Sequence, residues 1–424
     1  MSTFANSTTF AAFALACCTV VGLGIGCSSS SGGVSASDAG AAHDSGSVAD
    51  AGPSADGGAG VGPDVGRLLD NGGPKLTAAK IVTVVWSADP SAATIEAFTD
   101  KLGASSYWKD TLGEYGIGAA TAKHVRVTDA PVASYTTDAL EMYIAQQIAA
   151  SATSGWPAYD ASTVYAVFLP QATKLDPVGC YHGETQVGAD QHVPFVVIDP
   201  FDNGSRNIAD ALTQNAGHEI EEAVTNPHVF SDLGLVNFDA PHIAWNMLVS
   251  DPELGDICEE TSDAYFAGPA DLPYPLQRMW SNKSAAAGHN PCVPAPAEPY
   301  YGVTPLALET VSVFVDTAST PSVGLGYRVP IGTQKTIKVG FFSDKPVATP
   351  WTITAVEGNF TSPATNHRLT ITTGKGSGKT GDTDTITVTA NAMSLGAGNA
   401  VLLTVTSQAP GLPSHATPIL IGTY

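Results

Sequence analysis

The pattern of hydrophobic and polar residues divides the chain into stretches of different character. Residues 10–26 form an apolar run, and residues 28–66 then contain no aromatic side chain and almost no large aliphatic one. Over residues 67–296, short apolar runs alternate with segments of helical spacing. Beyond residue 300, apolar and polar residues alternate in short runs, as in exposed sheets. The pattern predicts two folded domains, as expected for 424 residues, a length too great for one compact core.

The region of residues 67–296 reads as an α/β domain. Its β-branched and aromatic runs predict strands at residues 80–86, 123–128, 162–170 and 194–199. Residues 136–151 begin with a capping threonine and place Leu140, Ile144 and Ile148 at helical spacing. The order of these elements predicts a sheet with helices packed against it.

A further helix is predicted between the last of these strands and Asn226-Pro227, where the proline ends it. Its apolar residues recur every four positions: Ile208, Leu212, Ala216, Ile220 and Val224. His218 and Glu222 each stand two residues beyond a member of this stripe, roughly 200° around the helix. We therefore expect both side chains to face outward, one turn apart, where they can reach one ion.

Two other short segments carry candidate chemistry. Glu253 and Asp256 lie close to Cys258 in the acidic segment 250–260. Tyr181 and His182 lie between two predicted strands that should run near the helix, where either side chain could line a cleft or donate to an oxyanion. A loop histidine without a chemical role is the alternative interpretation of His182.

The segment His218-Glu219-Ile220-Glu221-Glu222 resembles the H-E-x-x-H motif of the zincins, here of a secreted bacterial lipoprotein type, with glutamate in place of the second histidine. The resemblance implies a zincin-like domain with a mixed sheet, whose active-site helix follows an edge strand. It also implies that His218 and Glu222 bind metal and that Glu219 activates water. Zn²⁺ is the expected ion, with Mn²⁺ or Ca²⁺ as alternatives for a harder ligand set.

The third metal ligand is open at this stage. In zincins of the gluzincin type an acid follows the helix at a distance that Glu253 fits, and Asp256 lies close by. His228 stands ten residues after His218, the offset of the third metzincin ligand, but Thr225 replaces the glycine of that pattern. We therefore favour Glu253 or Asp256. The alternative to a metal site is a solvated acidic helix face.

The N-terminus predicts export. Residues 1–26 read as a signal peptide, and the sequence Leu-Gly-Ile-Gly-Cys that ends at Cys27 resembles a lipobox. Lipidation of Cys27 would anchor the chain to the outer membrane of a cell envelope, and plain secretion is the alternative. Residues 27–66 are predicted to be a disordered tether. A net charge of −22 disfavours nucleic acid as a partner.

Cysteine usage agrees with an oxidising compartment. After the signal peptide and the lipidated cysteine, Cys180, Cys258 and Cys292 remain. A bridge between Cys258 and Cys292 would tie the acidic segment to the end of the domain and leave Cys180 free and buried.

Residues 300–424 are predicted to form an immunoglobulin-like β-sandwich. Alternating runs predict strands at residues 311–317, 335–342, 351–358, 367–373, 384–390 and 401–407. Residues 373–382, rich in glycine and charge, are expected to be a flexible loop. The proline-rich approach predicts that this domain folds alone and that proteases cut near residues 294–301.

Together these features predict a lipid-anchored or secreted, metal-dependent hydrolase of peptide or protein substrates, which touches the bilayer only through its acyl anchor. The alternative is a non-catalytic surface binding or adhesion lipoprotein with a degenerate metallopeptidase-like domain.

Overall fold

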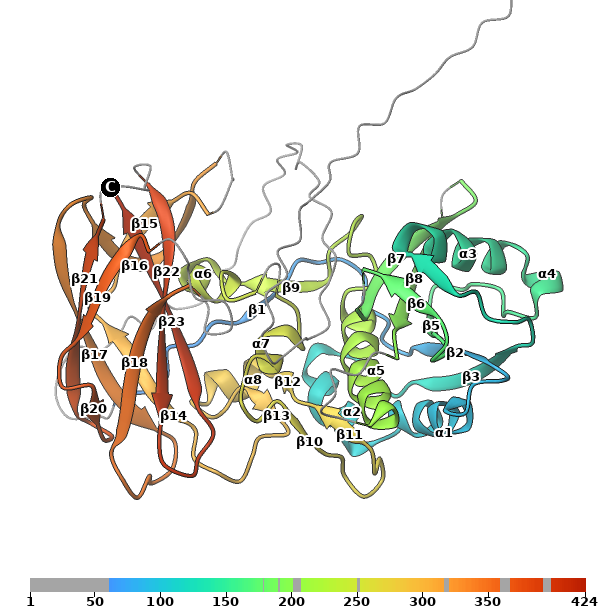
Figure 1. Cartoon of the computed structure of the whole chain (residues 1–424), viewed down its shortest axis with the longest axis horizontal. Coiled ribbons are helices and arrows are strands. Elements are labelled where there is room, and N and C mark those ends of the chain that lie inside the picture. Colours follow the sequence, from blue (N-terminus) through green and yellow to red (C-terminus); the bar gives the residue numbers. More distant parts are fainter. Residues whose placement is uncertain are drawn as a thin grey trace, which may run out of the picture.

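The computed structural model describes most of the chain as two bodies that lie side by side (Figure 1). The described residues are 61–177, 179–189, 191–200, 207–249, 252–315, 320–358, 367–391 and 398–424. The predicted signal peptide, Cys27 and residues 27–60 of the predicted tether lie outside the described residues, and so remain predictions. Of the helices described, none combines the length and the apolar character needed to cross a membrane.

The first body is built on a mixed five-stranded sheet with the order β3-β2-β5-β8-β7. Its strands are β2 (Lys80–Trp86), β3 (Thr121–Val127), β5 (Thr163–Phe168), β7 (Tyr181–Val187) and β8 (Gln191–Ile198). The first four in sheet order are parallel, and β7 runs antiparallel to β8 at the edge. The four predicted strands are confirmed, with ends shifted by a few residues. β7 was not predicted, because its polar residues hide the strand pattern.

Helices cover both faces of this sheet. They are α1 (Ala92–Leu102), α2 (Ser106–Leu112), α3 (Thr137–Ala149), α4 (Ser151–Ser154) and α5 (Ile208–Thr225), with a 3-10 turn η1 (Gly113–Tyr115). Alternate residues of β5 point to opposite faces, so Val164 and Ala166 join the core with α1 and α5, whereas Tyr165 and Val167 join the core with α3. The predicted cap of α3 is present, because the Thr136 side chain accepts a hydrogen bond from Ala139 N.

α5 differs from the predicted amphipathic surface helix. It ends at Asn226 as expected, but residues 211–225 are all buried, including His218 and Glu222. The expected outward orientation toward solvent is therefore wrong. α5 also follows the inner strand β8 and not an edge strand, because β7 adds to the sheet beyond it. The expectation that the helix follows an edge strand is corrected accordingly.

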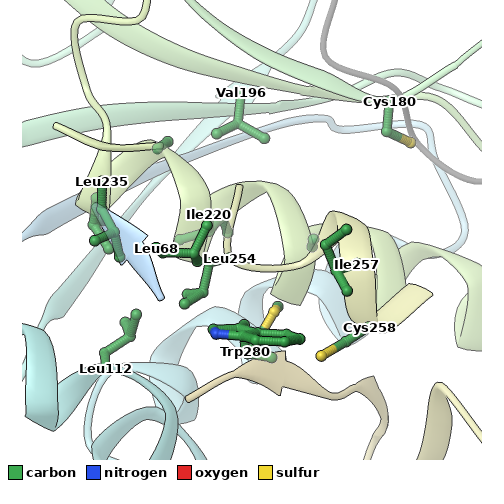
Figure 2. Packing of buried hydrophobic residues seen from close by; sticks show 14 of the residues in the cluster. Leu68, Leu112, Cys180, Val196, Ile220, Leu235, Leu254, Ile257, Cys258 and Trp280 are labelled. Atoms are coloured by element: carbon green, nitrogen blue, oxygen red, sulfur yellow. The ribbon is translucent and has the colours of Figure 1, made fainter. Parts of the chain in front are cut away.

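Residues 252–293 cover the side of α5 that faces away from the sheet. They contain α7 (Asp256–Glu259), β10 (Tyr265–Ala267), β11 (Pro275–Gln277), β12 (Met279–Trp280), α8 (Asn282–Ala286) and β13 (Cys292–Val293). Figure 2 shows Ile220 of α5 between Val196 of the sheet and Trp280 of this segment, and all three belong to one core cluster. The polar side of α5 is buried because a second layer of chain packs on it.

The second body is a β-sandwich. One sheet consists of β14 (Tyr301–Leu306), β17 (Gln334–Ser343), β21 (Thr383–Ala390) and β19 (Leu369–Thr373). The other consists of β15 (Glu309–Val313), β16 (Ser322–Val329), β23 (His415–Thr423), β22 (Asn399–Gln408), β18 (Trp351–Glu357) and β20 (Ser377–Gly378). Alternate residues of β17 and β22, such as Val339 and Leu403, fill the space between the sheets. Six predicted strands are confirmed, and β14, β16, β20 and β23 are additional.

Residues 373–382 are not the free loop that their composition suggested. Gly378 of β20 pairs with Trp351 of β18. The Asp384 carboxylate accepts hydrogen bonds from Lys375 N at 2.9 Å and Gly376 N at 2.7 Å. Main-chain hydrogen bonds therefore fix a segment that has little to bury.

The two bodies share an apolar core. The 3-10 turn η2 (Ala240–His242) and α6 (Ile243–Asn246) pack against β16 and β23, and one cluster joins Trp245 to Leu402 and Leu420 of the sandwich. Residues 61–66 also rest on this body, since Thr304 Oγ1 donates to Gly62 O at 2.5 Å. The predicted tether is thus wrong over its last residues, and the shared core argues against independent folding of residues 300–424.

Short strand pairs complete the first body. β1 (Leu68–Asp70) pairs with β9 (Leu235–Phe238), and β4 (Ser134–Thr136) pairs with β6 (Lys174–Asp176). The β1–β9 pair fixes the start of the domain close to the predicted boundary at residue 67.

Candidate metal centre

Two histidines and four carboxylates gather beside the middle of α5, and none of these residues is more than 7% exposed. These residues lie on strand β7, on helix α5, at the start of α7 and in the short segment just before α7. This His–carboxylate cluster consists of His182, His218, Glu219, Glu222, Glu253 and Asp256. Three separate parts of the chain therefore converge on one buried site.

His218, Glu222 and Asp256 form the first of two overlapping groups, and their ligand atoms lie within 4.8 Å of one another. His218 Nε2 is 3.0 Å from Glu222 Oε2 and 3.6 Å from Asp256 Oδ1. The first pair meets because four residues make about one turn of helix. Asp256 is held in place because its Oδ2 accepts a hydrogen bond from Glu253 N at 2.9 Å.

Gln277 of β11 sets the tautomer of His218. The Gln277 Nε2 amide donates to Gly255 O at 2.9 Å, so its Oε1 is the acceptor that lies 3.0 Å from His218 Nδ1. Nδ1 therefore carries a hydrogen, and in the neutral ring Nε2 turns a lone pair toward Glu222 and Asp256. Acceptors that face one another repel unless a proton or a metal cation lies between them.

His182, Glu219 and Glu222 form the second group, again with ligand atoms within 4.8 Å of one another. His182 Nδ1 lies 3.3 Å from Glu219 Oε2 and 3.7 Å from Glu222 Oε2. On its other side, His182 Nε2 lies 3.4 Å from Glu253 Oε2. Asn226 Nδ2 in turn donates to Glu253 Oε1 at 2.5 Å. Glu222 belongs to both groups.

Some polar atoms of the cluster are buried without a hydrogen-bond partner in the described part of the chain: Glu219 Oε1 and His182 Nε2. Within that part, no lysine or arginine forms an ion pair with the four carboxylates. Buried polar groups in folded proteins are nearly always satisfied, and unpaired buried charges are costly. The charged partners of these carboxylates among the described residues are therefore the two histidines.

The pKa values of the cluster follow from this crowding. Burial raises the pKa of Glu222 to about 8, with help from the neighbouring Asp256 and Glu253 carboxylates and against the effect of His218. Burial lowers the pKa of His218, but Glu222 and Asp256 outweigh it and hold that pKa well above 6.5. Protons therefore compensate the cluster when nothing else does, and a bound cation has to displace them.

The residues fit a divalent transition metal ion. Imidazole nitrogen and carboxylate oxygen both ligate Zn²⁺, and the same set accepts Mn²⁺. The structure thus contains a buried group of histidine and carboxylate side chains that could hold a metal ion. The identity of that ion stays a prediction.

Both acids proposed as third ligand lie in the cluster, but in different places. Asp256 completes the group around His218, whereas Glu253 faces His182. The rival His228 lies apart from them, because its Nδ1 is 3.0 Å from Glu184 Oε2. Interpretation of His228 as a ligand of this site is therefore wrong.

The two candidates on β7 have different surroundings. His182 points toward α5, whereas Tyr181 points to the opposite face, because successive strand residues alternate. Tyr181 packs edge-on against Phe195 in the core cluster with α3. Tyr181 is therefore a core residue, and the prediction that it lines the site is wrong.

The cysteines adopt the arrangement that the sequence analysis favoured. Cys258 and Cys292 form a disulfide, which ties the end of α7 to β13, and Cys180 is free and buried. The bridge lies only two residues beyond Asp256. It therefore anchors the segment that carries the acids over α5.

Sequence reasoning missed Gln277, which orients His218, and Asn226, which holds Glu253. Both are polar residues at the end of an element, and that position is the signal that could have singled them out. Glu221 was also missed: Thr111 Oγ1 donates to one of its oxygens at 3.0 Å, and burial raises its pKa well above 4.5. Glu221 faces α2, outside the cluster.

Comparisons with known proteins give little further guidance. No protein-family model and no curated protein sequence matches the chain. Among solved structures, "Crystal structure of the S-layer protein SbsC domains 4 and 5" matches with 12% identity, a TM-score of 0.17, and coverage of 29% of this chain and 53% of that one. "Structure of surface layer protein SbsC, domains 4-9" also matches with 12% identity, a TM-score of 0.17 and coverage of 29% and 14%.

"Chimeric titin Z1Z2 functionalized with a KLER exogenous peptide from decorin" matches with 8% identity, a TM-score of 0.15 and coverage of 28% and 94%. The chain thus spans about half or less of the two S-layer chains. At these TM-scores the likeness supports no conclusion about this chain.

Proposed function

We propose that the protein is a metal-dependent peptide hydrolase of the cell envelope, with a divergent zincin-like domain and an immunoglobulin-like sandwich. One observation carries the proposal. The oriented Gln277 amide makes His218 Nδ1 a hydrogen donor, so that Nε2 of the neutral ring turns its lone pair to Glu222 and Asp256. Such a set of acceptors is a ligand set for a cation.

His218, Glu222 and Asp256 would hold the metal. When bound, the ion would supply Lewis-acid polarisation and a more acidic water molecule. Glu219 follows His218 in the chain, and its Oε2 is fixed 3.3 Å from His182 Nδ1 while its Oε1 has no hydrogen-bond partner in the described residues. Glu219 Oε1 is therefore the atom that accepts a proton from the attacking water.

A specific observation favours the second candidate, a non-catalytic envelope protein in which the metal only stabilises the fold. The residues of the His–carboxylate cluster are between 1% and 7% exposed, so little of their surface is open to solvent. A substrate peptide would have to displace part of the chain to reach Glu219. The two candidates predict the same metal content but different activities.

Two glutamine substitutions on α5 test the proposal in the full chain. Glu222→Gln should lose the metal, because a neutral amide is a far weaker ligand than a carboxylate. Glu219→Gln should keep the metal held by His218, Glu222 and Asp256 and lose about 10²- to 10⁴-fold in peptide hydrolysis, because the proton acceptor is removed. His228→Gln, outside the cluster, is the matched control.

The measurements are zinc content by elemental analysis and cleavage of a peptide library. A wild-type chain that contains zinc but cleaves no peptide of the library supports the second candidate. A wild type that purifies without zinc and does not bind added zinc contradicts both candidates.

The proposed location rests on the sequence that ends at Cys27. Labelling with a fatty-acid analogue should mark the wild-type chain, and Cys27→Ser should remove the label and release the chain from the envelope. An unlabelled wild type would contradict the lipid anchor and leave secretion as the alternative.

A further inference from the structure

We propose that the His–carboxylate cluster binds two divalent cations, with Glu222 as the ligand that they share. The inference rests on the proposed function, because the first of the two cations is the one assigned to His218, Glu222 and Asp256. The second would bind His182, Glu219 and Glu222. A single-ion site of the H-E-x-x-E kind does not require the second imidazole or its neighbours.

The position of Glu222 is the geometric basis of the proposal. Its Oε2 lies 3.0 Å from His218 Nε2 and 3.7 Å from His182 Nδ1, so one oxygen atom faces both rings. Its Oε1 is fixed by a hydrogen bond from Gly255 N at 2.8 Å. Paired metal ions in proteins lie about 3.5 to 4 Å apart, a spacing that one bridging carboxylate can span.

Each imidazole has one ring nitrogen toward the cluster and a polar group beside the other. His218 uses Nε2 toward the cluster, while its Nδ1 donates to Gln277 Oε1 at 3.0 Å. His182 uses Nδ1 toward the cluster, while its Nε2 lies 3.4 Å from Glu253 Oε2 without forming a hydrogen bond. Two rings that each present one nitrogen to the cluster provide a ligand for each of two ions.

The charge of the cluster also supports two bound cations. Glu219, Glu222, Glu253 and Asp256, when ionised, carry four negative charges among residues at most 7% exposed. One divalent ion would compensate two of these charges and two divalent ions would compensate all four, in place of the protons that the cluster otherwise holds.

A second ion also has to leave the proposed proton acceptor free. Glu219 is 1% exposed, and its Oε1 has no hydrogen-bond partner in the described residues. An ion held by Glu219 Oε2, His182 Nδ1 and Glu222 Oε2 leaves Glu219 Oε1 free. The proton-accepting role proposed for Glu219 Oε1 is thus compatible with a second ion.

Zinc stoichiometry of the full chain is the first test. The chain is loaded with Zn²⁺ alone, freed of excess metal and measured by elemental analysis. Two zinc ions per chain are expected. One ion per chain would overturn the second site and leave the proposed function standing, whereas no bound zinc would contradict both.

Variants then assign each ion. His182→Gln should retain one ion, His218→Gln should retain the other, and Glu222→Gln should bind neither with its original affinity. The matched control His228→Gln, whose ring contacts Glu184, should retain two. Retention of two ions by folded His182→Gln would overturn the proposed ligand set.

A spectroscopic measurement needs no substitution. The wild-type chain loaded with Mn²⁺ should give the electron paramagnetic resonance spectrum of an exchange-coupled pair, because a shared carboxylate oxygen couples the two ions. A spectrum of isolated ions at two equivalents per chain would show that Glu222 does not bridge them and would overturn the inference.

Discussion

The sandwich and the α/β domain both bury carboxylates, but they compensate them in different ways. In the sandwich, Glu357 is 1% exposed, and its Oε1 accepts from Arg368 Nε at 2.8 Å. Its Oε2 accepts from the main-chain N–H groups of Arg368 and Leu369 at 2.7 and 2.8 Å. Both oxygens of Glu357 therefore have donors from the protein itself.

In the α/β domain the buried carboxylates face imidazoles and one another. Glu222 lies near His182 and His218, while Asp256 and Glu253 raise its pKa from nearby. A carboxylate with its own donors stabilises a fold. Carboxylates whose charged partners among the described residues are histidines can exchange the protons of the site for a metal cation.

Metal removal is expected to show the largest difference between the two bodies. Chelation with EDTA should lower the free energy of unfolding by about 4 kcal/mol where free metal had been 1,000-fold above its dissociation constant. Urea unfolding followed by tryptophan fluorescence measures the change, since Trp280 lies in the core beneath α5. Glu222→Gln is the control, because a chain that has lost its metal should not respond to EDTA. Equal stability of the wild type with and without EDTA would contradict a metal in this core.

Helix α5 shows how far the sequence could predict the site. Helical spacing correctly brought His218 and Glu222 together, because their distance depends only on the local helix. Their burial depends on residues 252–293, which lie far along the chain, and no local pattern encodes that contact. The role of His182 depends on the pairing of β7 with β8, which the polar sequence of β7 concealed.

The sandwich was easier to predict because alternation is a local signal. Runs such as residues 384–390 alternate between core and surface, and the structure contains them as strands. β23 was missed although most of its residues are buried, since its consecutive apolar residues Ile419, Leu420 and Ile421 interrupt any alternation. The shared core at Trp245 could not be predicted, because contacts between domains leave no periodic pattern in either partner.

Arg368→Ala should give the next largest effect, by removing the side-chain donor to Glu357 that the described residues contain. We expect a loss of about 2 kcal/mol in unfolding free energy, less than for a fully buried pair because the guanidinium is partly exposed and two main-chain donors remain. Zinc content should not change. Lys80→Ala is the matched control, since the Lys80–Asp160 pair is about half exposed and should contribute less than about 1 kcal/mol. Equal effects of the two variants would show that burial of Glu357 does not matter.

The interface between the bodies predicts a somewhat smaller effect. A Cβ atom at Gly324 would lie 2.5 Å from Ile243 Cγ2 of α6, so Gly324→Val should force the two bodies apart and cost about 1 to 2 kcal/mol. Calorimetry should show one transition for the wild type and two for the variant, with new protease cleavage near residues 294–300. At Gly113 a Cβ would meet nothing within 4 Å, so Gly113→Ala is the control. Two independent transitions in the wild type would restore the prediction that the sandwich folds alone.

The smallest expected effect is a pH dependence at His242, on the same interface. Burial lowers the pKa of His242, but hydrogen bonds to Asp239 and Asp64 outweigh burial and raise that pKa from 6.5 to about 9. A histidine whose folded pKa is raised contributes stability that is complete below pH 6.5 and is lost as the pH rises through about 9.

His242→Gln should therefore cost about 1 kcal/mol at pH 6, a modest value because Asp64 is partly exposed to solvent. The same variant should cost little at pH 9.5, where the imidazole of the wild type is already largely neutral. Unfolding free energies of both chains at the two pH values give the difference. His192→Gln, whose ring is 45% exposed, is the control and should show little change in stability between the two pH values. If His242→Gln is equally destabilising at both, the contribution of His242 comes from packing against the sandwich and not from its charge. The comparison between the two bodies would then rest on the buried carboxylates alone, because the interface would contain no charge-dependent contact at His242.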